Sequence, residues 1–212
     1  MNIKRFVVNP LDVNAYIVYE ETDGKKEGFI IDPGGDADKL LNFLRSEGIV
    51  LRAILNTHGH GDHIGAVDAL RNATGADFYL HEADVPMLSD AAKNLSLYFG
   101  ANVTAGVPDV LLRGGESFTV AGMKVQVLHT PGHTAGGVCY LMETSLFSGD
   151  SLFWESIGRT DFPGSSYNDL IAAIKEKIMP LGDDIIVYPG HGEKTSIGHE
   201  RKYNPYLMKS PF

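Results

Sequence analysis

The sequence has only one cysteine and no hydrophobic run that approaches the roughly 18 residues of a membrane-spanning helix. Cys139 cannot form an internal disulfide, which favours a reducing compartment, so we expect a cytoplasmic protein. The N-terminus also lacks a signal-peptide core, because only three apolar residues follow Lys4 and Arg5. These absences argue against secretion and against a membrane partner.

Positive charge is scarce as well. Lys and Arg number 18 against 27 Asp and Glu, which gives a formal net charge of −9. A nucleic-acid partner normally requires a basic face, so no nucleic-acid partner is expected. Hydrophobic residues make up 43% of the 212 residues, which is typical of a globular chain with a substantial core. The sequence does not indicate the oligomeric state.

The hydrophobic pattern switches repeatedly between short apolar strands and segments with helical spacing. Leu40, Leu41 and Leu44 predict a helix that starts at Asp36 and ends at Gly48. Further helices are predicted over residues 64–72 and 167–179, the latter with Ser166 in a capping-box position. Strands are predicted at residues 6–8, 15–19, 29–31, 53–55, 78–80, 146–147 and 185–187 and within 110–142. The less regular stretch 82–109 is expected to form a helix and a loop over a site.

The strongest functional signal is an HxHxDH pattern formed by His58, His60, Asp62 and His63 directly after an apolar strand. Residues two apart on an extended backbone share a face, so His58 and His60 can reach one metal ion. Asp62 and His63 lie where the chain turns and can face a second ion. Imidazole and carboxylate groups are ligands that zinc, iron and manganese accept. The alternative is a polar surface loop, in which three histidines and one aspartate would stand at this spacing by chance, and such a chance match is rare.

Three more candidate ligands stand in turns that follow later strands: His133, Asp150 and His191. Loops at strand ends are where sites are usually built. Each of these residues alone would be as compatible with a turn or a cap as with a site. Together with the HxHxDH pattern they indicate a metal centre.

The count of ligands suits two divalent metal ions per chain, with zinc preferred and iron or manganese as alternatives. The ligands divide into His58, His60 and His133 for one ion and Asp62, His63 and His191 for the other. Asp150 can bridge the ions with its two oxygens. Two ions about 3.5–4 Å apart can share a hydroxide and polarise a carbonyl. In this interpretation Asp62 and Asp150 are catalytic residues, and no Ser or Cys nucleophile is needed.

Four motifs together resemble the metallo-β-lactamase superfamily: THGHGDH at residues 57–63, PGHT at 131–134, SGD at 148–150 and PGHG at 189–192. Their order and spacing cover nearly the whole chain from Asp32 to His191. The resemblance implies one α/β domain over residues 1–212. It also implies an αββα sandwich, in which two packed mixed β-sheets are flanked by helices and the metals lie at one edge.

Within that superfamily the chain resembles the short bacterial form of glyoxalase II-like thioester hydrolases. Asp150 stands where the best-known zinc β-lactamases use Cys, and the segments 156–163 and 195–206 look like the short form. The resemblance implies a small-molecule acyl-thioester substrate such as S-lactoylglutathione, hydrolysed to lactate and glutathione by a metal-bridging hydroxide. The long enzymes hold glutathione with a C-terminal helical domain. Only 21 residues follow His191 here, so a broader thioester range is expected.

Two further residues have candidate roles beside the metals. Asp32 ends an apolar strand and is predicted to accept hydrogen bonds that orient the loop of His58 to His63. Arg159 lies near the position where the long enzymes place a basic residue against the substrate. Its guanidinium suits a substrate carboxylate, and an ion pair with Asp161 is the alternative.

The remaining candidates carry weaker signals. Cys139 lies in an apolar run and is expected in the core. The other three histidines are not expected to ligate a metal: His81, His129 and His199. Two pairs stay open between contact with substrate and ordinary packing: Tyr98 with Phe99, and Lys202 with Tyr203.

Three rival functions remain. Persulfide dioxygenases resemble this chain in motif and length and would hold a single iron, by analogy with His58, His133 and Asp150. The presence of His191 favours a second metal and hence hydrolysis. A nuclease of the same superfamily is disfavoured by the net charge of −9, and a non-catalytic binding module by the complete ligand set.

Overall fold

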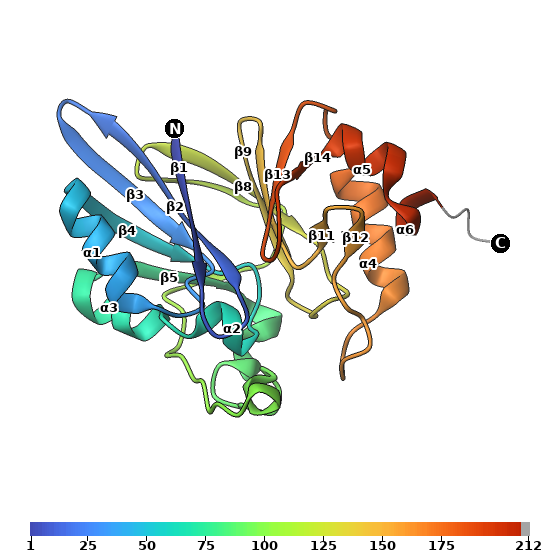
Figure 1. Ribbon diagram of the computed structural model, residues 1–212, viewed down its shortest axis with the longest axis horizontal. Coiled ribbons are helices and arrows are strands. Elements are labelled where there is room, and N and C mark those ends of the chain that lie inside the picture. The colour runs from blue at the N-terminus through green and yellow to red at the C-terminus, as the bar shows by residue number, and fades with distance from the viewer. Residues whose placement is uncertain (209–212) are drawn as a thin grey trace.

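The first of two large sheets is built from the N-terminal half of the chain in a computed structural model that describes residues 1–208 (Figure 1). Its six strands lie in chain order: β1 (Asn2–Val8), β2 (Val13–Thr22), β3 (Lys25–Ile31), β4 (Ile49–Leu55), β5 (Asp77–His81) and β6 (Val110–Leu112). β1, β2 and β3 pair antiparallel, and β3 to β6 pair parallel. The sheet is therefore mixed.

The second sheet comes from the C-terminal half and has the order β14-β13-β10-β9-β8-β7. Its strands are β7 (Ser117–Val120), β8 (Met123–His129), β9 (Val138–Met142), β10 (Ser145–Gly149), β13 (Ile186–Pro189) and β14 (Thr195–Ser196). Only β10 and β13 pair parallel. A small hairpin of β11 (Leu152–Phe153) and β12 (Ser156–Ile157) follows β10.

Helices cover the outer faces of both sheets (Figure 1). The first sheet carries α1 (Ala37–Glu47) and α3 (Val67–Thr74), and the second carries α4 (Tyr167–Ala173), a π-helical turn (Ile174–Ile178), α5 (Ile197–Tyr203) and α6 (Pro205–Met208). The predicted αββα sandwich is confirmed. No helix within residues 1–208 is long and apolar enough to cross a membrane.

The period-two alternation of strands explains why the sandwich has three apolar layers. In β3, Phe29 and Ile31 point into the core between the sheets, whereas Ile30 points to the layer under α1 and α3. Successive side chains of a strand face opposite sides, so a strand buried on both faces is apolar throughout. Tyr140 and Phe147 of the second sheet complete the central layer.

Of the first two predicted helices, one is confirmed and the other has different bounds. The helix that ends at Gly48 is confirmed, since α1 stops there and Gly48 adopts φ +66°. The helix predicted over 64–72 is wrong in its bounds, because the chain forms a short α2 (Gly61–Ile64), breaks, and resumes as α3. At the break the Ala66 N–H donates to the Pro33 carbonyl (2.8 Å), so packing on the turn after β3 interrupts the helix.

The other two predictions concern residues 167–179 and residues 82–109. The helix over 167–179 is confirmed in extent, although its second half is π-helical, and the Ser166 side chain caps it by accepting from the Asp169 N–H. The stretch 82–109 holds two short 3₁₀ helices, η1 (Glu82–Met87) and η2 (Ser96–Phe99), in place of one helix.

Candidate metal centre

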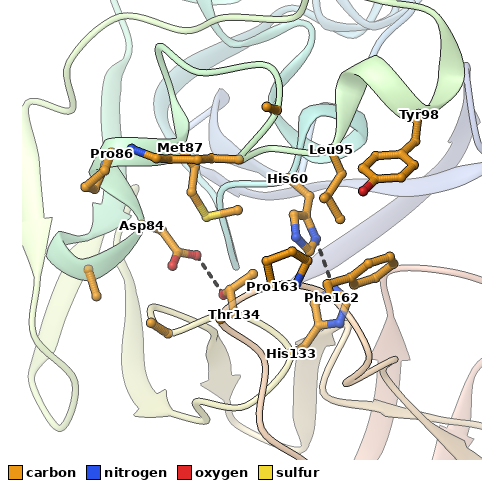
Figure 2. Close-up of a pocket in the computed structure, with 15 residues that line it drawn as sticks. His60, Asp84, Pro86, Met87, Leu95, Tyr98, His133, Thr134, Phe162 and Pro163 are labelled. Atoms are coloured by element: carbon orange, nitrogen blue, oxygen red, sulfur yellow. Dashed lines mark hydrogen bonds between the residues drawn. The ribbon is translucent and has the colours of Figure 1, made fainter.

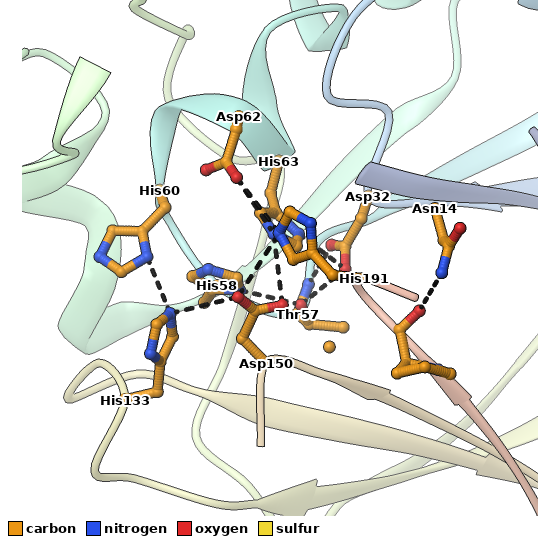
Figure 3. A network of polar contacts seen from close by, with 12 residues as sticks. Asn14, Asp32, Thr57, His58, His60, Asp62, His63, His133, Asp150 and His191 are labelled. Atoms are coloured by element: carbon orange, nitrogen blue, oxygen red, sulfur yellow. Dashed lines mark hydrogen bonds and ion pairs between the residues drawn. The ribbon is translucent and has the colours of Figure 1, made fainter. Parts of the chain in front are cut away.

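The seven predicted ligands all lie together at one edge of the sandwich, where loops from both sheets meet (Figure 3). The first four follow β4 and enter α2. The other three come from the β8–β9 loop, from the end of β10 and from the loop after β13. Val13 of the first sheet bridges to His191, and the Asn14 N–H donates to the Gly190 carbonyl (2.7 Å), which ties the two halves together beside the centre.

One group of ligands consists of three histidines, His58, His60 and His133, whose ring nitrogens lie within 4.8 Å of one another. His133 Nε2 is 3.0 Å from His60 Nδ1. The ring centroid of His58 is 4.7 Å from that of His60 and 4.9 Å from that of His133. Three imidazoles around one point match the ligand set of a catalytic zinc site.

A second group consists of Asp62, His63 and His191. Asp62 Oδ2 lies 3.4 Å from His191 Nε2 and 3.8 Å from His63 Nε2. Imidazole nitrogen and carboxylate oxygen are suitable ligands for zinc, iron and manganese.

The Asp150 carboxylate lies between the two groups. Its Oδ2 is 3.6 Å from His133 Nε2 of the first group and 3.7 Å from His191 Nε2 of the second. Its Oδ1 is 3.5 Å from His63 Nε2. One carboxylate is thus within reach of ligands from both groups, as a bridging ligand has to be.

Unpaired buried atoms show, independently of the distances between the ligands, that these residues fit divalent metal ions. Among the described residues, His58 Nε2, His63 Nε2 and Asp150 Oδ1 are buried and have no hydrogen-bond partner. Buried polar atoms are almost always paired, so an unpaired cluster that converges on one point calls for a ligand. Two nitrogen lone pairs and a carboxylate oxygen suit a cation.

The electrostatics differ between the two ligand groups. Burial and the neighbouring imidazoles hold the pKa of His58 and of His60 well below 6.5, so both rings are neutral and able to bind metal at pH 7. Burial lowers the pKa of His63, but the carboxylates of Asp150, Asp62 and Asp32 raise it to about 10. The same three carboxylates would attract a metal cation in place of a proton.

Asp32 lies behind the histidine loop, with its oxygens already engaged. The Thr57 N–H and the Thr57 hydroxyl each donate to its carboxylate at 2.7 Å, and His63 Nδ1 lies 3.1 Å from Asp32 Oδ2. The contact with Nδ1 leaves Nε2 of His63 to face the centre. Such a partner fixes the orientation of a metal-binding imidazole.

A residue that the sequence analysis missed, Asp84, joins the two histidine loops. Its carboxylate accepts from the Gly59 N–H (3.0 Å), the Gly136 N–H (2.7 Å) and the Thr134 hydroxyl (2.7 Å). The residue is 1% exposed, and burial raises the pKa of its carboxyl against the lowering by these hydrogen bonds. The only sequence signal was an aspartate shortly after a predicted strand.

Arg159 takes up the ion pair that was one of its two predicted roles. Its guanidinium binds Asp161 through two hydrogen bonds of 2.9 and 2.7 Å and lies 4.3 Å from the Phe162 ring centroid. Its carbonyl lies 2.7 Å from His133 Nδ1, so the Arg159 backbone orients a candidate ligand. A contact between its side chain and a substrate stays a prediction.

Most of the remaining candidate residues from the sequence lie outside the ligand groups. His81 and His129 stack on each other with centroids 4.2 Å apart, and His199 contacts Trp154 and Glu155. Cys139 is fully buried, as predicted. Lys202 and Tyr203 pair on α5, with the ammonium 4.8 Å from the ring centroid.

Tyr98 and Phe99 lie closer to the ligands, since both line a cavity of about 640 Å³ that opens onto the centre. Asp62, Asp150 and His191 also line this cavity. Its volume is in the range of small-molecule sites.

Comparison with known proteins gives consistent relatives. A family model described as "Metallo-beta-lactamase superfamily" matches residues 8–191. The chain is 36% identical to hydroxyacylglutathione hydrolase GloC of Haemophilus influenzae, over 98% of each protein. It is similar to the crystal structure of the B3 metallo-beta-lactamase BLEG-1, with TM-score 0.92 and 43% identity over 98% of this chain and 100% of the other. It is also similar to TTHA1623 in a di-iron-bound form, with TM-score 0.85 and 37% identity over 96% and 100%.

Proposed function

Since this chain belongs to the metallo-beta-lactamase superfamily, we propose that it is a metal-dependent hydrolase whose substrates are acyl-thioesters. The observation that carries the proposal is the Asp150 carboxylate placed between two ligand groups beside a cavity of about 640 Å³. The 36% identity to a hydroxyacylglutathione hydrolase over 98% of both chains supports a thioester as the bond that is cleaved.

In this proposal the seven ligand residues hold two divalent cations, with zinc preferred over iron and manganese. Divalent cations bound there would supply Lewis acidity, which acidifies water and polarises a carbonyl oxygen. The chain contributes the geometry. Asp32, Asp84 and the Arg159 carbonyl hold the loops and rings that carry the ligands.

Asp62 and Asp150 are the proposed proton acceptors. Burial raises the pKa of the Asp62 carboxyl, but His63 and His191 outweigh it and hold that pKa well below its usual range. The low pKa keeps Asp62 ionised but makes it a weak base, so the proton that water loses as its oxygen attacks the thioester carbonyl is held there only in passing. The C–S bond then breaks, the acid and the thiol are released, and the proton goes to the departing sulfur.

A two-ion site is preferred here over the single iron of a persulfide dioxygenase. That alternative requires only His58, His133 and Asp150. His191 would then have no ligand role, although its Nε2 lies 3.4 Å from Asp62 Oδ2 and 3.7 Å from Asp150 Oδ2.

The test is steady-state hydrolysis of S-lactoylglutathione by protein loaded separately with zinc, iron(II) or manganese. Released thiol is measured with a chromogenic thiol reagent. We expect turnover with at least one metal. We expect Asp150→Ala to lower kcat/KM by more than about 100-fold, because loss of an outer partner alone typically costs 10–100-fold.

Asp77→Ala is the matched control, because Asp77 is an exposed carboxylate at the start of β5 and should leave the rate unchanged. Full activity and full metal content in Asp150→Ala would contradict the assignment of that residue. No thiol release with any metal would contradict thioester hydrolysis, and oxygen uptake with glutathione persulfide would then support the iron dioxygenase.

β-Lactam hydrolysis is a second candidate, favoured by the 43% identity to the BLEG-1 metallo-beta-lactamase. Both reactions involve attack on a carbonyl, so the same centre would serve either. A chromogenic cephalosporin assayed beside the thioester separates them. We expect the thioester to give the higher kcat/KM.

A further inference from the structure

A second cavity of about 570 Å³ is also lined by His60 and His133 (Figure 2), but not by Asp62 or His191. It is formed by η1, the segment that follows it, and the loops that carry His133 and Phe162. Its wall is mainly apolar, with side chains from Pro86, Met87, Leu95, Tyr98, Phe162 and Pro163. We call it the η1 cavity.

Two polar side chains of the η1 cavity, Asp84 and Thr134, are already engaged in hydrogen bonds. The Thr134 hydroxyl donates to Asp84 Oδ2 at 2.7 Å, and the other acceptor sites of Asp84 are filled by backbone N–H groups. Lys93 is at the rim with its side chain 60% exposed, 3.6 Å from the Asp90 carboxylate. A buried charge without a partner is costly, so this cavity does not suit a charged or strongly polar group.

The 640 Å³ cavity also has a largely apolar wall but differs in its charged groups. It contains Asp62, Asp150 and His191 as well as the Arg159–Asp161 pair. The ring of Phe162 lines both cavities, beside Arg159 and Asp161, which line only the 640 Å³ cavity. On one side its centroid is 4.3 Å from the Arg159 guanidinium, and its edge approaches His60 with centroids 5.8 Å apart.

A thioester has two arms, and its carbonyl has to lie at the metal centre between them. Since the two cavities meet at His60 and His133, one arm can enter each. The thiol arm of a carrier such as glutathione is polar and charged, which matches the cavity with Arg159 and Asp161. The acyl arm is then left for the η1 cavity.

We infer that the η1 cavity is the acyl-binding site and that it selects uncharged, apolar acyl groups larger than lactoyl. This inference rests on the proposed thioester hydrolysis. It assigns a substrate class to residues outside the ligand set, among which Met87 and Phe162 are specificity-determining.

The test compares kcat/KM for S-lactoyl-, S-acetyl-, S-butyryl- and S-hexanoylglutathione, which share one thiol. We expect kcat/KM to rise along the acetyl, butyryl and hexanoyl series by up to about fourfold per methylene, the value for full burial of a CH₂ group. Met87→Lys places a charge in the cavity and should reduce the ratio of hexanoyl to acetyl kcat/KM by at least about tenfold.

Two further variants keep the test decisive. Leu97→Lys is the matched control, because Leu97 is 57% exposed on the same segment and lines neither cavity; its chain-length profile should equal that of the unmodified protein. Ala135→Phe fills the cavity from an exposed position and tests the same ratio if Met87→Lys does not fold.

The outcomes separate the two levels of the hypothesis. A flat or falling chain-length profile in an active enzyme overturns the acyl-site inference and leaves thioester hydrolysis standing. A rising profile that persists in both Met87→Lys and Ala135→Phe also overturns it. If none of the thioesters is hydrolysed with any metal, the proposed function fails, and the inference fails with it.

Discussion

At the residue scale, Asp84 is not a candidate ligand, but it hydrogen-bonds both loops that carry the histidines of the first ligand group. Its carboxylate accepts hydrogen bonds from the N–H of Gly59, which stands between His58 and His60, and from the hydroxyl of Thr134, which follows His133 directly in the chain. One buried carboxylate thereby fixes the spacing between two loops that must present three imidazoles to one ion. A Cβ on Gly136 would come within 2.6 Å of the Asp84 carboxyl carbon, so the loop approaches closely only because glycine is there.

Replacing Asp84 by Asn should weaken zinc binding by about 10–100-fold, the usual cost of losing an outer partner of a metal site. An amide has only one oxygen to accept the three donors, so one or more N–H groups lose their partner. Unfolding of the metal-free protein should become easier by about 1–3 kcal/mol. Competition with a chelator measures the affinity, and urea denaturation measures the stability.

Asp90→Asn serves as the control, because the Asp90 side chain is 40% exposed and its carboxylate accepts from the N–H groups of Ala92 and Lys93 in its own turn. A purely structural role for Asp84 predicts lower stability with unchanged zinc affinity. That result would show that Asp84 does not position the ligands.

At the element scale, the turn after β3 positions α2 and hence Asp62 and His63. A Cβ on Gly34 would overlap the Asp62 carbonyl oxygen, and the Ala66 N–H donates to the Pro33 carbonyl at 2.8 Å. The turn and the short helix are therefore in direct backbone contact. This contact accounts for the break between α2 and α3.

Gly34→Ala should push α2 away from the turn and destabilise the protein by about 1–3 kcal/mol, as other overpacking substitutions do. Zinc affinity should fall as well, because Asp62 and His63 move with α2. Thermal denaturation and metal titration measure the two effects. Gly106→Ala is the control, since the new Cβ would meet mainly the flexible end of Arg71 and the Asp68 carboxylate. Unchanged zinc affinity in Gly34→Ala would indicate that α2 adapts independently of the turn.

At the scale of the whole molecule, the centre joins the two halves of the sandwich. His58 to His63 follow the first sheet, whereas Asp150 and His191 follow strands of the second. A cation bound by both sets binds only the folded arrangement, so its binding free energy adds to the stability of the fold.

Zinc at 100 times its dissociation constant should therefore stabilise the protein by about 2.7 kcal/mol. For a chain of this size, that corresponds to a rise in Tm of about 5–11 °C. Differential scanning calorimetry with and without zinc measures the rise. His133→Ala should reduce it, because one half of the sandwich loses a ligand, whereas Asp77→Ala should not. An equal rise in His133→Ala would mean that zinc stabilises the protein elsewhere.

The sequence by itself determined the fold class and the set of candidate ligands. The last three residues of β3 (29–31) and of β4 (53–55) are apolar on both faces because helices and a second sheet cover them, and this pattern is visible as two short apolar runs. The ligands HxHxDH, His133, Asp150 and His191 stand out because metal chemistry demands particular residue types in loops directly after strands. Both signals are local, so they can be read along the chain.

Only the tertiary structure decided how distant segments meet. The helix predicted over 64–72 is interrupted near its start by a backbone contact with Pro33, which lies about 30 residues earlier. Asp84 acquired its position from donors at Gly59 and Gly136, and Phe162 lines both cavities beside His60 and His133. Arg159 faces Asp161 in the folded chain, although the sequence allowed a substrate carboxylate equally well. Except for the local Arg159–Asp161 pair, these outcomes depend on contacts across the fold, and no periodicity or motif in the sequence encodes them.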